Sequence, residues 1–175
     1  MELTDEITIP ASRDAVYKAL NDVDVLKTCI PGCEELDREG ENDLVAKVTL
    51  KVGPVKARFG GRVTLDPSKA PDAFSLSGEG DGGIAGFAKG GADVELIEDG
   101  DQTILRYTAK AETGGKIAQL GGRLILSTAK KLSKQFFGTF EKVMSGEAEV
   151  EKACAPQFEL ASTDAVTSNL AASCR

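Results

Sequence analysis

The fold is decided by residues 113–145, which read TGGKIAQLGGRLILSTAKKLSKQFFGTFEKVMS. Apolar side chains recur in this stretch at steps of three and four residues, the spacing of one face of an α-helix. The pattern predicts one long amphipathic helix, with Thr113 as its N-cap and Gly146 as the left-handed residue that ends it. A helix of roughly 29 residues is about 43 Å long, and it needs a broad, curved surface against which to bury its stripe. The stripe consists of Ile117, Leu120, Leu124, Thr128, Leu132, Phe136 and Phe140.

The composition restricts the classes of function. The chain contains no histidine, which removes the commonest general base and the commonest metal ligand, and so weighs against acid–base and zinc chemistry. The formal net charge of −7 argues against nucleic acid as the main partner. No apolar run approaches the length of a membrane span, and the N-terminus lacks the pattern of a signal peptide. We therefore expect a cytoplasmic protein.

The length and hydrophobic content fit one domain with a short appendage. The chain has 175 residues, of which 41% are hydrophobic, enough to form a core. Residues 146–175 are mostly small or polar and have no sustained periodicity. We expect residues 1–145 to form a ligand-binding domain and residues 146–175 to form a flexible tail.

The part of the chain that precedes the long helix is dominated by strand patterns. A first strand is predicted at Leu3–Ile9, followed by a short helix at Arg13–Leu20 and a second one after Asp22. From Glu34 onward, apolar and polar side chains alternate, which predicts about six further antiparallel strands. The predicted fold class is α+β: a curved antiparallel sheet of about seven strands wrapped around the long C-terminal helix, with two short helices after the first strand.

Two segments carry a strong local positive charge. The predicted hairpin between Leu44 and Leu65 has five basic residues and no acidic residue, all on the phase that faces solvent. Such a stripe is either a solvated face with cross-strand ion pairs or a surface that docks an acidic protein or an anionic lipid. The polar face of the long helix adds further lysines. The candidate docking residues are Lys47, Lys51, Lys56, Arg58, Arg62, Lys130 and Lys134.

The glycine-rich stretch at residues 78–91, GEGDGGIAGFAKGG, has the most unusual composition in the chain. The strand phase places Gly78 and Gly80 on the inner face, and the phase of the returning strand does the same for Gly86 and Gly90. An inner face without side chains has two explanations. The glycines either permit tight curvature of the sheet or leave unfilled volume for a ligand.

Cys29 and Cys33 flank Pro31-Gly32, a pair that suits the centre of a type II turn. Two cysteines at this spacing could hold a metal ion only with two more ligands, and the neighbouring sequence offers none. Small buried thiols beside a turn are the simpler interpretation.

Several short motifs resemble one known family. They are Asn21-Asp22, CIPGCE at residues 29–34, VGPVK at 52–56, GEG at 78–80, GFAKG at 86–90, GKIAQLG at 115–121 and the pair Phe136-Phe137. The order of elements resembles the helix-grip fold that START lipid-transfer domains (the SRPBCC superfamily), birch-pollen allergens and polyketide cyclases share. Within that fold, the chain resembles the carbon monoxide dehydrogenase G subunit over about residues 1–144.

The resemblance implies an accessory protein and not a catalyst, without a covalent cofactor. Members resemble lipid-binding carriers, associate with the membrane, and are thought to link a molybdenum-containing carbon monoxide dehydrogenase to membrane quinone. The family also includes proteins whose partner is a different oxidoreductase. Members attached to the membrane end in an apolar segment, whereas Ala153–Arg175 of this chain is polar and short in apolar runs.

Three hypotheses follow from the pattern and the resemblance. The first is a module that binds a quinone or a lipid between helix and sheet. The second is a docking protein for the recruitment or maturation of an oxidoreductase, with peripheral membrane contact. The third is a cyclase or hydrolase that uses Asp5, Glu79, Asp81 or Tyr107 as acid or base. The first hypothesis places Phe59, Gly78, Gly80, Gly86, Phe87, Tyr107, Leu120 and Leu124 around the ligand.

Overall fold

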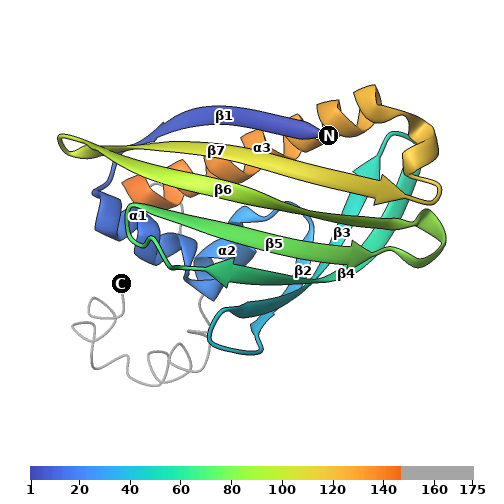
Figure 1. The fold of residues 1–175 in the computed structure, drawn as a ribbon, viewed down its shortest axis with the longest axis horizontal. Coiled ribbons are helices and arrows are strands. Elements are labelled where there is room, and N and C mark those ends of the chain that lie inside the picture. Colours follow the sequence, from blue (N-terminus) through green and yellow to red (C-terminus); the bar gives the residue numbers. More distant parts are fainter. Residues whose placement is uncertain (147–175) are drawn as a thin grey trace, which may run out of the picture.

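The computed structural model describes residues 1–146, in which one strongly curved antiparallel sheet wraps around the helix α3 (Figure 1). The sheet has seven strands in the order β1-β7-β6-β5-β4-β3-β2. The strands are β1 (Glu2–Ile9), β2 (Cys33–Arg38), β3 (Asp43–Val52), β4 (Val55–Asp66), β5 (Ala73–Asp81), β6 (Phe87–Asp99) and β7 (Gln102–Gly114). The helices are α1 (Arg13–Leu20), α2 (Val23–Cys29) and α3 (Gly122–Ser145), with the 3₁₀ turns η1 (Gly83–Ala85) and η2 (Ala118–Leu120). The predicted fold class is confirmed. The predicted tail lies almost entirely outside the described residues.

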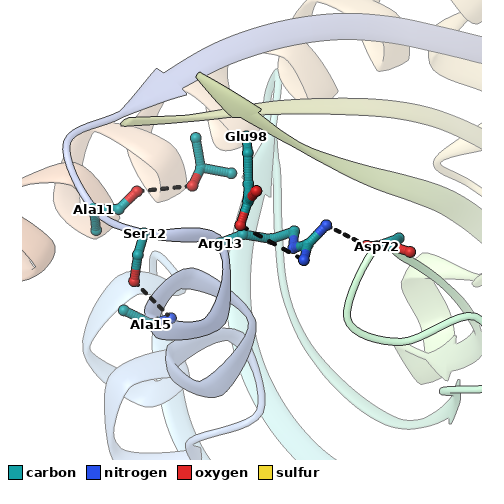
Figure 2. A network of polar contacts seen from close by, with 7 residues as sticks. Ala11, Ser12, Arg13, Ala15, Asp72 and Glu98 are labelled. Carbon is teal, nitrogen blue, oxygen red and sulfur yellow. Dashed lines mark hydrogen bonds and ion pairs between the residues drawn. The ribbon is translucent and has the colours of Figure 1, made fainter. Parts of the chain in front are cut away.

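The two short helices begin where their capping residues predict. Ser12 accepts a hydrogen bond from the backbone N–H of Ala15 at the start of α1 (Figure 2). Asp22 accepts from the N–H groups of Asp24 and Val25 at the start of α2. These side chains satisfy backbone donors that have no partner within the helix. Both helices therefore form next to the sheet, in the positions that the sequence predicts.

Polar contacts hold α1 to the ends of the central strands (Figure 2). Arg13 forms ion pairs with Asp72, which precedes β5, and with Glu98 of β6, where the second N···O distance is 3.5 Å. Thr103 of β7 is fully buried, and its hydroxyl donates to the carbonyl of Ala11 at 2.7 Å. These contacts join segments that are far apart in the sequence, so they fix the end of the sheet at which the core is filled.

The packed core lies beneath the C-terminal half of α3. Phe140 of α3, Ile9 of β1, Val16 of α1 and Leu105 of β7 are all fully buried there. Their burial removes apolar surface from water on both the helix and the sheet, which supplies the main driving force for closing the sheet over the helix. The N-terminal half of α3 faces a different part of the sheet, and that part forms the cavity described below.

The predicted start of the long helix is wrong. The helix begins at Gly122 and not at Thr113, because Thr113 extends β7 and pairs with Ala88 of β6. Gly115 and Gly121 both have positive φ angles, of 77° and 89°, which an α-helix excludes. The predicted end is confirmed, since Gly146 takes the left-handed conformation with a φ angle of 80°.

A candidate ligand-binding cavity

A cavity of about 610 Å³ lies between α3 and the inner face of the sheet. Strands β3 to β7 and the N-terminal two-thirds of α3 form its wall, which is almost entirely apolar. This volume falls within the range of about 300–1,000 Å³ that is typical of small-molecule sites. Its wall includes Val48, Leu50, Phe59, Val63, Gly78, Gly80, Ala88, Gly90, Ala109, Ala111, Ile125, Ala129, Leu132 and Phe136.

The cavity exists because the inner side chains of the sheet become smaller along the strands. At the core end, Phe74, Val94 and Tyr107 are opposite one another across β5, β6 and β7, and all three are buried. Two steps further along, this cross-strand row becomes Leu76, Ala92 and Ala109. The space between helix and sheet therefore widens away from the core.

The two following rows of the same face contain still less side-chain volume. One row is Gly78, Gly90 and Ala111, and the next contains Gly80 and Ala88. A Cβ atom built on Gly80 would meet no heavy atom closer than 3.8 Å, so the backbone there leaves open space. A Cβ atom on Gly78 or Gly90 would instead come within 2.9 and 2.1 Å of a backbone oxygen of the neighbouring strand, so these two glycines permit close packing of the curved strands. Both explanations for the glycine-rich stretch therefore apply, with open space at Gly80.

The α3 side of the cavity is apolar and ends in a group of aromatic rings. Phe137 stacks on Tyr107 with a centroid distance of 5.3 Å, and Phe136 stacks on Phe140 at 6.1 Å. Thr128 also lines the wall, but its hydroxyl already donates to the carbonyl of Leu124 at 2.9 Å. The wall can therefore hold an apolar molecule through dispersion and burial and offers few directional contacts.

Tyr107 is buried at the closed end of the cavity. Burial raises the pKa of Tyr107, the neighbouring Ser133 opposes this rise, and the negative charge of Asp5 adds to it. Ser133 lies close, but the pair does not reach hydrogen-bond geometry, and the hydroxyl has no other partner within residues 1–146. A phenol with a raised pKa stays protonated near neutral pH, so it is not available as a base.

Of the four candidate acid–base residues, Asp5 and Tyr107 are opposite each other in the β1–β7 register, whereas Glu79 and Asp81 lie at the far end of β5. Asp5, Glu79 and Asp81 are exposed, whereas Tyr107 is buried. The carboxylate of Asp81 accepts a hydrogen bond from the N–H of Gly83 at 2.6 Å, which stabilises the loop between β5 and β6. These positions give no pair of carboxylates that could share a substrate between them.

Three of the eight predicted lining residues contribute to the wall, namely Phe59, Gly78 and Gly80. Phe87 does not, because it alternates with the inward residue Ala88 and therefore points to the outer face, where 47% of its surface is exposed. Gly86 lies in the loop before β6 with a φ angle of 110° and packs against the backbone of Gly114.

The other three predicted lining residues lie beside the cavity. Tyr107 lies behind the wall at the core end, and Leu120 belongs to η2, before the helix begins. Leu124 packs against Gly53 in the turn between β3 and β4. The missed wall residues include Ala109, Ala111 and Phe136. Alternation along β7 and the helical stripe would have identified them. Ligand binding by any of these residues stays a prediction.

Acidic side chains of β2 and of the turn that follows it neutralise most of the basic hairpin. Lys47 pairs with Glu35 at 2.7 Å, Arg58 pairs with Glu34 at 2.7 Å, and Arg62 pairs with Glu39. A hydrogen bond from Thr49 and the guanidinium of Arg58 lower the pKa of Glu34. Three of the five basic side chains of the hairpin are thus in cross-strand ion pairs, as the interpretation of a solvated face predicts. Lys51 and Lys56 are not part of this network, and Lys130 and Lys134 are exposed on α3.

Cys29 and Cys33 are free thiols, and no group of three or more potential metal ligands occurs within residues 1–146. Burial raises the pKa of Cys29 to about 11, and burial also raises the pKa of the less buried Cys33. Only the thiolate reacts with alkylating agents, and at pH 8 a pKa of 11 leaves roughly one thiolate in a thousand.

We therefore expect iodoacetamide at pH 8 to label Cys33 in the folded protein at least about tenfold faster than Cys29. The rate at Cys29 should rise about tenfold per pH unit toward pH 11, because the thiolate fraction rises in that proportion. Mass spectrometry of the cysteine peptides measures both rates. Equal labelling rates in the folded state would contradict the buried position of Cys29.

The sheet, the long helix and the apolar space between them define a START-like helix-grip protein. Residues 6–145 match the family described as the carbon monoxide dehydrogenase G subunit (CoxG). The chain belongs to this family. A search of curated proteins gave no match. None of the helices within residues 1–146 is both long and apolar enough to cross a membrane.

Solved structures share the fold. A conserved protein from Geobacillus kaustophilus is 28% identical, with a TM-score of 0.79 over 85% of this chain and 98% of that one. A START superfamily protein from Mycobacterium smegmatis is 12% identical, with a TM-score of 0.68 over 84% and 99%. The Zhui aromatase/cyclase from Streptomyces sp. R1128 is 15% identical, with a TM-score of 0.63 over 83% and 93%. The last two likenesses show the fold alone.

Proposed function

We propose that this protein is a non-catalytic carrier that binds a quinone or a lipid in the cavity between α3 and the sheet. The observation that carries the proposal is the row of residues without bulky side chains, Gly78, Gly80 and Gly90, opposite the apolar face of α3. This arrangement leaves space where a protein interior is normally packed to the density of a crystal. An unfilled apolar space of this kind favours a ligand that is itself apolar.

Burial of apolar surface supplies the affinity. Each Å² of apolar area that is removed from water contributes about 25 cal/mol, before the cost of ordering the ligand. A quinone ring with part of its isoprenoid chain, or one acyl chain, offers enough apolar area to reach micromolar affinity on this scale. The aromatic rings of Phe136 and Phe137 at the closed end suit a planar ring.

Family membership supports the choice of partner. The family is named for a subunit of carbon monoxide dehydrogenase. We propose that the protein serves a molybdenum-containing dehydrogenase of this type, or a related oxidoreductase, by connecting it to the membrane or to the quinone pool. In this role the ligand moves between a bilayer and the partner, and the carrier shields it from water in between.

A cyclase or hydrolase that uses the same cavity is the second candidate, because the Zhui aromatase/cyclase has the same fold. The apolar wall and the separation of Asp5, Glu79 and Asp81 favour the carrier over this alternative. An enzyme of this type needs acid and base groups within reach of one substrate.

Native mass spectrometry and calorimetry test the carrier. We expect full-length protein from a quinone-containing host to retain a non-covalent apolar species. Delipidated protein should bind ubiquinone-1 with micromolar affinity and a negative heat-capacity change, which marks burial of apolar surface. Protein that emerges clean from such a host and binds neither ubiquinone-1 nor palmitate would refute the proposed function.

A further inference from the structure

Ile84 is the most exposed large hydrophobic side chain within residues 1–146, with 83% of its surface accessible. It lies in η1, the connection between β5 and β6, and Phe87, three residues further along at the start of β6, is 47% exposed. Burying an aliphatic side chain of this size is worth about 1.5–3 kcal/mol relative to leaving it in water. A loop that holds two such side chains in solvent is typical of a contact surface.

The loop holds Ile84 in place through its own hydrogen bonds. The N–H of Gly83 donates to Asp81 at 2.6 Å, immediately before Ile84. Ala85, immediately after it, is buried, and its carbonyl accepts from the N–H of Ile117 at 2.9 Å. A turn that hydrogen bonds hold in place therefore points Ile84 outward. Burying this side chain against a binding partner would cost little conformational entropy, because the loop is already ordered.

Three connections lie together at this end of the sheet (Figure 1). The bond from Ile117 joins the β7–α3 connection to η1, and Gly53 in the β3–β4 turn lies against Leu124 at the start of α3. We call this surface the loop end and define it as residues 51–56, 82–87 and 115–123. It is remote from the β6–β7 turn, which lies at the opposite end of the sheet.

The loop end is basic although the protein is acidic. Its three segments carry Lys51, Lys56, Lys116 and Arg123 and no acidic residue, in a chain with a net charge of −7. All four side chains are exposed, and none forms an ion pair with another residue of the described chain. Lys51 is directly opposite Lys56 in the β3–β4 register, an arrangement of like charges that destabilises a hairpin unless an anion lies nearby.

The cavity extends to this same end. Val52, Thr113 and Ile117 line the cavity and belong to or border the three connections. A surface that binds to the loop end would therefore lie close to the space in which the ligand is held. Asp81 borders the loop end, opposite Phe87 in the β5–β6 register, and its carboxylate accepts from the N–H of Gly83. Exposed apolar side chains on a surface that also carries lysine and arginine are the pattern of proteins that insert shallowly into an anionic membrane surface.

We propose that the loop end docks on an anionic lipid bilayer, with Ile84 and Phe87 inserted at the boundary of headgroups and acyl chains. Lys51, Lys56, Lys116 and Arg123 then contact lipid phosphates. An acidic protein could also pair with these four basic side chains. A protein partner would need a matching pocket for the projecting Ile84, whereas lipid chains rearrange around a single inserted side chain. The inference rests on the proposed function, since a carrier of membrane-soluble ligands exchanges them at a bilayer.

Flotation of the full chain with vesicles tests the docking surface. We expect binding to phosphatidylcholine vesicles that contain phosphatidylglycerol, weaker binding to pure phosphatidylcholine, and loss of binding at high salt. Ile84→Ser should lower the affinity for anionic vesicles about tenfold, because insertion of the side chain is lost. The double variant Lys51→Glu, Lys56→Glu should lower it by at least about tenfold at low salt.

Matched controls lie at the opposite end of the sheet. Ile97 is 38% exposed near the β6–β7 turn, and Lys69 is exposed before β5, so Ile97→Ser and Lys69→Glu should bind vesicles like the wild type. Equal effects of Ile84→Ser and Ile97→Ser, or no binding to anionic vesicles, would overturn the proposal. Binding of the loop end to an acidic protein, without binding to anionic vesicles, would also overturn the proposal.

Failure of the docking surface and failure of the proposed function give different results. Ile84→Ser should keep its affinity for ubiquinone-1 in solution while it loses vesicle binding. Protein that binds anionic vesicles through Ile84 but no ubiquinone-1 and no palmitate would refute the carrier and leave the docking surface intact. Protein that binds ubiquinone-1 but no anionic vesicles would refute the docking surface and leave the carrier intact.

Discussion

Gly80→Leu is expected to lower the affinity for ubiquinone-1 about thirtyfold, with the fold retained. Gly80 lies on the inner wall, and a Cβ there has no neighbour closer than 3.8 Å, so the new side chain extends into the cavity. Its φ angle is not in the left-handed region, so leucine meets no backbone strain. Displacing roughly 80 Å² of ligand contact costs about 2 kcal/mol, the equivalent of this loss in affinity. Calorimetry measures it.

Gly60→Leu is the matched control for Gly80→Leu. Gly60 is on β4, directly opposite Asp81, and its Cβ would project from the outer face with no atom within 4 Å. The same side chain is thus added to a neighbouring strand on the other side of the sheet. Ligand affinity should be unchanged in this variant. Equal losses in both variants, or none in Gly80→Leu, would show that the ligand does not occupy the cavity.

The sheet could be predicted because strand patterns are local. Alternation of apolar and polar residues, together with turns such as Gly53-Pro54, predicts where strands begin and end. The start of α3 could not be predicted, because Ile117 and Leu120 have α-helical spacing in a segment that forms only a short 3₁₀ turn. Pairing of Thr113 with Ala88 is a non-local contact that overrides this local pattern.

The wall of the cavity could be predicted in part. The pleat fixes which residues of one strand share a face, so the sequence suffices to place Gly78 and Gly80 inside. The same rule places Phe87 outside, since its neighbour Ala88 points inward. Leu124 shares the helical face of Thr128, but it packs against Gly53 at the end of the cavity, a contact between distant segments that the helical pattern does not show.

The charges of the hairpin show a further limit of sequence-based inference. The hairpin that carries Lys47, Arg58 and Arg62 contains no acid between Leu44 and Leu65. Its counter-charges come from β2 and the turn that follows β2, and only the β2–β3 pairing brings them into contact. Lys51 and Lys56 are among the predicted docking residues, but the sequence does not show that they share the loop end with Ile84, because that surface joins three segments that are distant in the sequence.

Phe140→Ala should reduce the free energy of unfolding by about 3–5 kcal/mol, the cost of a large cavity in a filled core. Phe140 is fully buried and stacks on Phe136 at the core end of α3. Urea denaturation of the delipidated protein, followed by circular dichroism, measures the change from the shift in midpoint at constant m-value.

Phe136→Ala tests whether the space along α3 is less tightly packed at the cavity than in the core around Phe140. Phe136 lines the cavity one helical turn before Phe140 and is only partly buried, so it already borders empty space. Its truncation should cost about 1–2 kcal/mol, because fewer contacts are lost and an existing cavity is enlarged. It should also weaken binding of ubiquinone-1. Equal losses in the free energy of unfolding for the two truncations, measured in delipidated protein, would mean that Phe136 and Phe140 are packed equally tightly. The carrier would then have no cavity in which to hold its ligand.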